Sequence, residues 1–353
     1  MALILYSLVL LASFYLLTVI CNRYFVASLD QIAAKLRMNS DMAGATLMAI
    51  GSSAPELFVS FIALFKPGNE AVGAGTIVGS ALFNILVIIG ASAMVRKAFI
   101  AWQPIIRDTI FYSLSIILLI WAFWDGQINL LESLLFLGLY VAYIVAVMQW
   151  RKILPYKEEQ KDQPENLAQD INQELKKKSW IGYFMGGINT AFDFIFPKAE
   201  KYWTTFFLSI AFIAALSWVL VESAVGVAGI LHVPAVIIGL TVLAAGTSIP
   251  DLMSSIIVAR QGRGGMAISN AIGSNIFDIL IGLGLPWAIV TIGGKIIPVA
   301  TENLNSSIIL LFGTVISVLF FLIAKKWHIN KFAGFGLISL YVLYLVWSIA
   351  QVI

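Results

Sequence analysis

Two short segments, far apart in the chain, place an acidic side chain among hydroxyl groups within otherwise apolar sequence. Residues 49–57 read AIGSSAPEL, and residues 244–252 read AAGTSIPDL. Each segment contains a glycine, a proline and a carboxylate, which is Glu56 in the first and Asp251 in the second. Proline lacks an amide proton and clashes with the preceding helical turn, so each proline is expected to interrupt a helix and free a carbonyl. Carboxylates, hydroxyls and freed carbonyls together favour a hard cation.

A second pair of segments adds further oxygen donors. Residues 79–84 read GSALFN, residues 273–278 read GSNIFD, and the polar residues in each recur four positions apart on one helix face. No histidine or cysteine occurs in any of the four segments. This donor set favours calcium, magnesium or alkali ions over zinc or copper. The candidate ligands are Ser52, Ser53, Glu56, Ser80, Asn84, Thr247, Ser248, Asp251, Ser274, Asn275 and Asp278.

The four segments form an internal repeat. At a constant offset of 195 residues, GATLMAIGSSAPELFVS (44–60) aligns with GLTVLAAGTSIPDLMSS (239–255), so that Glu56 faces Asp251. At an offset of 194, IVGSALFNILVIIG (77–90) aligns with AIGSNIFDILIGLG (271–284). Two matched blocks in the same order and at nearly the same spacing indicate a duplicated chain.

The elements that carry these segments are expected to be membrane-spanning helices. The chain is 60% hydrophobic and only 12% charged, whereas a soluble domain carries about 25% charged residues. Backbone groups within the hydrocarbon core require helices or closed barrels, and a helix needs about 20 apolar residues to cross it. The hydrophobic runs predict ten spans at roughly 4–26, 40–65, 70–94, 105–124, 128–149, 203–226, 233–258, 265–291, 306–324 and 332–352. We interpret the first as a retained helix rather than a signal peptide.

The predicted fold is therefore an all-α integral membrane protein in which two five-helix repeats have inverted topology. Because each half has an odd number of spans, the second copy has the opposite orientation in the membrane. Secondary transporters built from inverted repeats bind their cargo near the membrane midplane. The predicted domains are residues 1–150, a polar linker at 151–202, and residues 203–353.

The distribution of basic residues predicts the orientation. With both termini outside, Lys66 and Lys295 are the only two of 22 lysines and arginines that fall on the outer side. The linker at 151–202 is then cytoplasmic, and a plasma membrane is the expected location. The basic residues are dispersed over loops, so we expect no nucleic-acid partner.

Three candidate carboxylates, Glu56, Asp251 and Asp278, are expected at the bilayer centre. Each would cost at least ~2.5–3.5 kcal/mol unless a cation compensates its charge. With one calcium ion bound, the three carboxylates retain one net negative charge, whereas several monovalent cations can neutralise the site fully. Such a site suits an antiporter, because alternative cargoes satisfy the same carboxylates.

Several residues are expected to have structural roles only. Gly75 and Gly79 are predicted to permit close helix packing. Asp108 and Glu132 lie near predicted helix ends and are assigned to the membrane interface. Glu222 lies within a span without an acidic repeat partner, and it stays open as a helix-end or pathway residue.

The segments AIGSSAPELFVS, AAGTSIPDLMSS, GSALFNILVIIG and GSNIFDILIGLG resemble the alpha-repeats of the calcium/cation antiporter superfamily. The sodium/calcium exchangers are the most similar group, especially the potassium-dependent type. This resemblance implies alternating access, with calcium held by Glu56 and Asp251 and with Ser52 and Thr247 beside them. The same resemblance suggests that potassium is also transported, with Asp278 at the position that an aspartate occupies in the potassium-dependent exchangers. The sodium positions and central lining that it implies are Ala49, Ser53, Ser80, Ala244, Ser248, Ser274, Asn84 and Asp278.

Three alternatives remain open at this point. A proton/calcium antiporter would use the same carboxylates, a cation channel would need a continuous pore, and an intramembrane aspartyl protease would use Asp251 and Asp278. The protease leaves the mirrored Glu56 and Asn84 unexplained. We expect a secondary transporter without a cofactor, whose partners are calcium, sodium and the lipid bilayer. The sequence leaves its oligomeric state open.

Overall fold

The computed structural model describes residues 2–35, 49–66, 68–95, 98–99, 102–154, 192, 194–196, 201–260, 264–299 and 304–350. Within these ranges the chain is almost entirely helical. Nine of the helices described are long and apolar enough to cross a membrane. They are Ala2–Phe25, Ala71–Val95, Trp102–Ala122, Leu130–Trp150, Tyr202–Leu231, Ala235–Ile256, Ala267–Thr291, Asn305–Ala324 and Lys331–Ala350.

These nine helices agree with nine of the ten predicted spans to within several residues. The remaining prediction, 40–65, begins outside the described residues, and its described part contains only short helices. Most of the linker at 151–202 also lies outside the described ranges.

The first half of the chain forms a sequence of helices broken by π-helical segments. Its elements are α1 (Ala2–Ile20), η1 (Cys21–Phe25), α2 (Val26–Lys35), α4 (Ala49–Ser52), α5 (Ala54–Ala63), α6 (Ala71–Phe83), η3 (Asn84–Ile88), α7 (Ile89–Val95), α8 (Trp102–Ala122) and α9 (Leu130–Ile153).

The elements of the second half are α12 (Tyr202–Leu231), α13 (Ala235–Ile238), η5 (Gly239–Leu243), α14 (Ala244–Thr247), α15 (Ile249–Arg260), α16 (Gly264–Phe277), η6 (Asp278–Leu283), α17 (Gly284–Thr291), α18 (Asn305–Ala324) and α19 (Lys331–Ala350). From α4 in the first half and α14 in the second, the helices follow in the same order of long and short elements.

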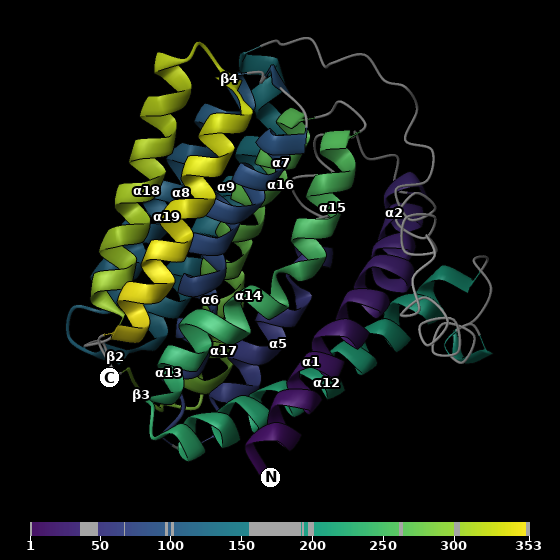
Figure 1. Ribbon diagram of the computed structural model, residues 1–353, viewed down its shortest axis with the longest axis vertical. Coiled ribbons are helices and arrows are strands. Elements are labelled where there is room, and N and C mark those ends of the chain that lie inside the picture. Colours follow the sequence, from purple (N-terminus) through teal and green to yellow (C-terminus); the bar gives the residue numbers. More distant parts are fainter. Residues whose placement is uncertain are drawn as a thin grey trace.

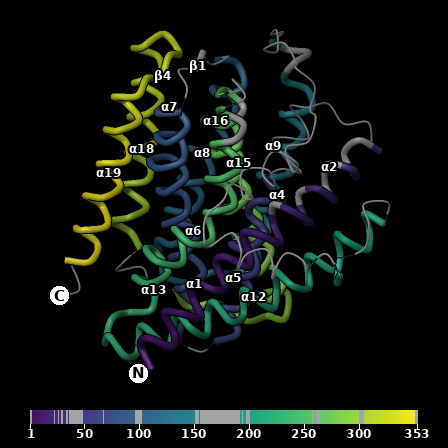
Figure 2. The backbone as a smooth tube through the Cα atoms, turned by 45° about the vertical axis from the view of Figure 1, so that its right-hand side comes forward, coloured from purple at the N-terminus to yellow at the C-terminus, as the bar shows by residue number. Residues whose placement is uncertain are grey.

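Most helices run alongside one another, whereas α1 and α12 cross the bundle obliquely (Figure 1). The turned view in Figure 2 shows the same pair running together below the upright helices. α1 and α12 pack along each other and contribute to a hydrophobic cluster separate from the one formed by α6, α8, α9, α16 and α18. The protein therefore has two hydrophobic packing units, and α5 contacts both α12 and α6.

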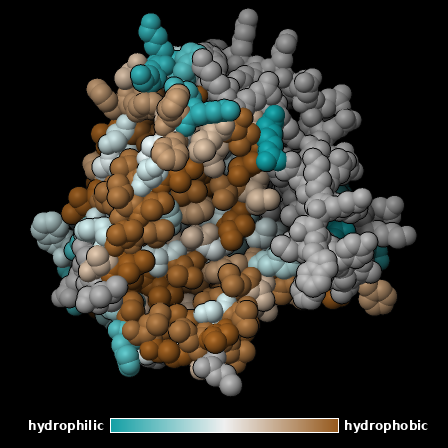
Figure 3. Space-filling view, viewed as in Figure 1, coloured by the Kyte–Doolittle hydropathy of each residue, from teal (hydrophilic) through white to brown (hydrophobic). Residues whose placement is uncertain are grey.

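The outer surface is apolar where the long helices are exposed. Hydrophobic residues cover the middle of the face in Figure 3, and hydrophilic residues gather mainly toward its upper and lower ends. Large side chains such as Ile4, Phe320 and Leu343 are more than half exposed. Exposed apolar patches of this extent need a nonaqueous neighbour, and a lipid bilayer supplies one.

Four two-residue strands connect loops from the two halves. β1 (Ala98–Phe99) pairs antiparallel with β4 (His328–Ile329), and β2 (Gln127–Ile128) pairs antiparallel with β3 (Ile297–Pro298). Each pairing joins a loop of the first half to a loop of the second, so the halves are tied together at both strand pairs.

The predicted helix interruptions occur at equivalent places in the two halves. Ser53 separates α4 from α5 with ψ 7°, and Ser248 separates α14 from α15 with ψ 3°. These ψ values lie outside the helical range, and each precedes a proline by two residues. The prediction of breaks near Pro55 and Pro250 is therefore confirmed.

Two π-helical segments begin at the other pair of repeated polar residues. η3 starts at Asn84, and η6 starts at Asp278. π-helical turns widen the backbone and frequently occur at functional sites. All four polar segments identified in the sequence therefore coincide with irregular helix geometry.

Glycines allow α6 to lie directly against the first turns of the seventh span. A Cβ added to Gly75 would approach the carbonyl oxygen of Val236 to 2.8 Å, and one added to Gly79 would meet the carbonyl of Leu240 and the side chain of Ala244. The predicted packing role of Gly75 and Gly79 is confirmed. This close approach brings Ser80 of α6 toward Ser248.

Candidate functional site

The carboxylate of Glu56 lies in a group of hydroxyls from three helical segments. Glu56 is fully buried in the first turn of α5. The hydroxyls of Ser80 and Ser248 donate to its Oε1 atom at 3.4 Å and 3.2 Å, and these two hydroxyls are 2.6 Å apart. Ser80 comes from the first half and Ser248 from the second, so both halves build the surroundings of Glu56.

Asp251 occupies the equivalent position in the second half. It is fully buried in the first turn of α15, and the hydroxyl of Ser274 donates to its Oδ1 atom at 3.3 Å. The hydroxyl of Ser52 lies 3.4 Å from that of Ser274. Each carboxylate therefore has a serine of its own half beside it, and each of those serines contacts a serine of the opposite half.

The centre of the site contains two asparagines and Asp278. Asn84 donates through Nδ2 to Oδ1 of Asn275 at 2.8 Å, and Asn275 donates through its own Nδ2 to the carbonyl of Ala81 and to the hydroxyl of Tyr112. Asp278 is fully buried, close enough to Glu56 and Asp251 for their charges to interact.

Several buried oxygens of this site have no hydrogen-bond partner. They are Oε2 of Glu56, Oδ2 of Asp251, Oδ1 of Asn84, the Ser53 hydroxyl and both carboxylate oxygens of Asp278. A buried unsatisfied polar group costs about 1–3 kcal/mol, and more if it is charged. Five of these six atoms are acceptors only, so the arrangement suits a ligand that brings positive charge. Monatomic cations bring that charge without adding bulk.

The other predicted residues are buried in the same region. Ala49 and Ala244 are fully buried, and their carbonyls accept the backbone amides of Ser53 and Ser248 across the helix breaks. The Thr247 hydroxyl donates to the Leu243 carbonyl. The structure thus places all thirteen predicted residues within the interrupted helices and their neighbours.

No group of three or more histidine, cysteine, aspartate or glutamate side chains converges as a metal cluster in the described ranges. Around Glu56 and Asp251 the neighbouring oxygens are neutral hydroxyls, those of Ser80, Ser248 and Ser274. Calcium accepts such mixed oxygen ligands in flexible geometry, whereas structural zinc sites use cysteine and histidine.

Tyr112 is a contributor that the sequence reasoning missed. Its ring is fully buried in α8, and its hydroxyl accepts the hydrogen bond from Asn275. A tyrosine in an apolar helix has no distinctive spacing, so only its contact with Asn275 identifies it. It lies four residues after Asp108, on the same helix face.

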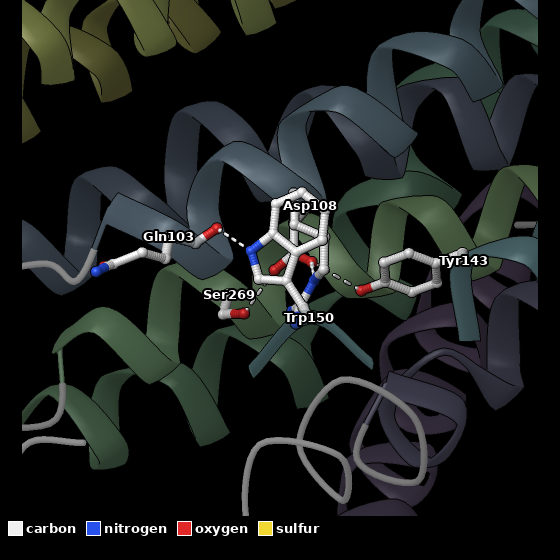
Figure 4. A network of polar contacts seen from close by, with 6 residues as sticks. Gln103, Asp108, Tyr143, Trp150 and Ser269 are labelled. Carbon is white, nitrogen blue, oxygen red and sulfur yellow. Dashed lines mark hydrogen bonds and ion pairs between the residues drawn. The ribbon is translucent and has the colours of Figure 1, made fainter. Parts of the chain in front are cut away.

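Asp108, which the sequence assigned to the membrane interface, is fully buried inside the protein. Its Oδ1 accepts from Nε of Arg107 at 2.7 Å and from the hydroxyl of Tyr143 at 3.2 Å, while its Oδ2 accepts from Ser269 at 2.8 Å. Figure 4 shows these side chains converging beside the Trp150–Gln103 hydrogen bond. The carboxylate joins α8, α9 and α16, and α16 carries Ser274 and Asn275. Asp108 therefore positions a helix of the candidate site.

We expect Tyr143→Phe to lower the stability of the protein by about 1.5–3 kcal/mol, because it removes a hydrogen bond to the buried, charged Asp108. Tyr140→Phe is the matched control, since the hydroxyl of Tyr140 is buried without a partner. Thermal melting of both purified variants checks the prediction. Equal melting temperatures for the two variants would contradict it.

Glu222 lies away from the candidate site. Its carboxylate forms an ion pair with Lys66, and its side chain is 58% exposed. Exposed pairs of this kind contribute little to stability. The missing repeat partner of Glu222 is consistent with its distance from the site.

Comparisons with known proteins identify the family of the chain. Residues 6–149 and 201–350 match the family described as "Sodium/calcium exchanger protein". Human sodium/potassium/calcium exchanger 2 is 30% identical over an alignment that covers 99% of this chain and 78% of that protein. Mouse sodium/potassium/calcium exchanger 4 is 29% identical, with 99% and 81% covered.

The solved structures that resemble this fold include the sodium-calcium exchanger NCX_Mj soaked with 100 mM Na+ and 10 mM Sr2+. That structure has a TM-score of 0.60 and 22% sequence identity, and the match covers 98% of both chains. The same protein soaked with 10 mM Na+ and no Ca2+ gives a TM-score of 0.59 and 23% identity. The match to the family pattern covers most of the chain, and the chain therefore belongs to the sodium/calcium exchanger protein family.

Proposed function

We propose that the chain is a secondary active antiporter that exchanges calcium for sodium across a membrane by alternating access. It is a transporter, as its relatives are, and not an enzyme. The observation that carries the proposal is the set of unpartnered oxygens on Glu56, Asp251 and Asp278, buried between interrupted helices of both halves. Two kinds of cation that compete for these oxygens would be exchanged one for the other.

The proposed calcium ligands are Glu56 and Asp251, assisted by Ser52 and Thr247. Ser248 of the second half donates to Glu56, and Ser52 of the first half contacts Ser274, which donates to Asp251. These contacts between the halves support a calcium site with carboxylate and neutral oxygens from both. The proposed sodium ligands and central lining are Ala49, Ser53, Ser80, Ala244, Ser248, Ser274, Asn84 and Asp278.

We infer ten membrane spans arranged as two inverted five-helix repeats, with residues 1–150 and 203–353 as the repeats and 151–202 as their linker. The equivalent breaks at Ser53 and Ser248 and the π-helices at Asn84 and Asp278 support a repeat. Matching ring contacts add support: Tyr140 meets Phe277 edge-on, and Tyr341 meets Phe83 in the same way. The span at 40–65 completes the first repeat.

The orientation follows from the basic residues. We propose that both termini are outside, that 151–202 is cytoplasmic and that the protein resides in the plasma membrane. Thiol or protease accessibility in intact cells tests this topology. Cleavage within 151–202 from the outer side would contradict it.

Transport in sealed proteoliposomes tests the function. Vesicles loaded with sodium and diluted into sodium-free buffer are expected to accumulate labelled calcium, and vesicles without the sodium gradient are not. A pH gradient supplied in place of sodium tests the proton/calcium alternative. Calcium uptake that is equally fast with a pH gradient alone would reject sodium coupling.

Potassium co-transport is proposed because relatives of this chain are named sodium/potassium/calcium exchangers. Asp278 is the candidate ligand, since both of its carboxylate oxygens are buried without partners. We expect potassium to stimulate calcium uptake by the unmodified protein severalfold, and Asp278→Asn to remove this stimulation while retaining sodium-driven uptake. Uptake assays with and without potassium in both proteins measure it. Equal stimulation of both proteins would exclude Asp278 as the potassium ligand.

A further inference from the structure

A second polar layer lies one helical turn beyond Asp251. The side-chain amide of Asn270 in α16 donates to the hydroxyl of Ser255 in α15 at 3.4 Å, and these side chains are 3% and 0% exposed. Ser255 follows Asp251 by four residues, and Asn270 precedes Ser274 by four. Each therefore shares a helix face with its partner in the candidate site, displaced toward the connection between α15 and α16.

This layer contains a buried oxygen that nothing satisfies. The Oδ1 atom of Asn270 has no hydrogen-bond partner, and neither does Oδ2 of Asp251. Asp251 lies one helical turn from Ser255 on α15, and Ser274, which donates to Asp251, lies one turn from Asn270 on α16. An unsatisfied acceptor at such depth is destabilising. A small hydroxyl or apolar side chain at residue 270 would avoid burying an unsatisfied oxygen. The presence of an amide there therefore suggests that its oxygen binds a ligand.

The equivalent layer of the first half lacks this feature. Thr76 stands at the position equivalent to Asn270, and its hydroxyl donates to the carbonyl of Val72 at 2.9 Å. Ser60 is equivalent to Ser255, and Gly73 packs so closely on it that an added Cβ would lie 2.7 Å from its Cα. The first-half layer is satisfied and tightly packed, so the unpartnered amide is a feature of the second half alone.

We propose that Asn270, Ser255 and the Oδ2 atom of Asp251 form an additional binding position for a hard cation between α15 and α16. Without a cation, the amide nitrogen of Asn270 donates to the hydroxyl of Ser255. A half-turn of the amide exchanges its nitrogen and oxygen, so that a sodium or calcium ion beside Asp251 meets three oxygens. At this position the protein oxygens replace part of the ion's hydration shell before the ion enters the central site.

The position lies on one side of the membrane only. The connection between α15 and α16 belongs to the cytoplasmic side in the proposed topology, so the layer would serve ions that enter or leave through the cytoplasm. This inference rests on the proposed exchange function. It predicts that changes in this layer alter the calcium KM on the cytoplasmic side more than the KM on the outer side, which the central site alone does not produce.

Sided transport assays test the inference. Asn270→Thr installs the residue that the first half carries, and we expect it to raise the KM for calcium on the cytoplasmic side about tenfold. The KM on the outer side should change less than twofold. Asn270→Asp retains the side-chain oxygens and should return the cytoplasmic KM to within about threefold of the unmodified value. Thr76→Ala is the matched control and should leave both values unchanged.

Anomalous diffraction from crystals soaked with strontium gives a measurement that does not depend on transport. A peak beside residue 270 is expected in the unmodified protein and not in Asn270→Thr. Such a peak in a protein that fails to exchange sodium for calcium would reject the proposed function and retain the binding position. Exchange by the unmodified protein without this peak, or with KM shifts equal on both sides, would overturn the binding position alone. Thermal melting of Asn270→Thr verifies that the variant is folded.

Discussion

Glu56→Gln is expected to abolish sodium-driven calcium uptake while leaving the fold intact. Glu56 is fully buried, its Oε2 atom has no partner, and its Oε1 atom accepts from serines of both halves. Glutamine has the same shape and retains one acceptor oxygen, but it removes the negative charge that attracts the ion. Buried charge pairs lose about 2–5 kcal/mol when one partner is removed, which corresponds to a reduction in calcium affinity of at least roughly 30-fold.

Labelled-calcium uptake into sodium-loaded proteoliposomes measures this effect. The matched control is Glu222→Gln, which makes the same substitution at an exposed glutamate within a membrane span. Glu222→Gln should transport calcium at nearly the unmodified rate. Unimpaired uptake by Glu56→Gln would exclude Glu56 as a calcium ligand.

Gly79→Val is expected to prevent stable folding. The helix α6 lies against η5 so closely that a Cβ at residue 79 would collide with the backbone of Leu240 and approach the side chain of Ala244 to 2.7 Å. A backbone cannot move aside as a flexible side chain can, so the two helices must separate. Overpacking of this kind costs about 3 kcal/mol, a large fraction of the 5–15 kcal/mol typical of a folded domain.

Size-exclusion profiles and thermal melting of the purified protein measure this prediction. Gly138→Val is the control, because a Cβ at residue 138 meets nothing within 4 Å. We expect Gly138→Val to elute and melt like the unmodified protein, whereas Gly79→Val should aggregate or melt far lower. Comparable melting of the two variants would show that α6 and η5 do not need their close approach.

The helix interruptions could be predicted from the sequence because their causes are local. Pro55 and Pro250 break the helix wherever the chain places them, and the duplicated pattern assigned the same role to both. The long spans could be predicted for a similar reason, since hydrophobic length alone determines which helices can cross a bilayer. The candidate site followed from combining these two features.

The environment of individual polar residues could not be predicted in this way. Asp108 was assigned to the interface because it lies near the start of α8, yet α9 and α16 enclose it and supply Tyr143 and Ser269. Tyr112 was overlooked because its role depends on Asn275 of another helix. These roles depend on which helices face one another, and a single sequence contains no direct record of that pairing.

Equilibrium binding of labelled calcium to the purified protein tests whether calcium and sodium bind alternately to one set of carboxylates. We expect a saturable calcium signal that sodium displaces completely, with a steep dependence on sodium concentration because several sodium ions replace one calcium ion. Asp251→Asn should lose the signal. Calcium binding that persists at saturating sodium, or that survives in Asp251→Asn, would contradict the account.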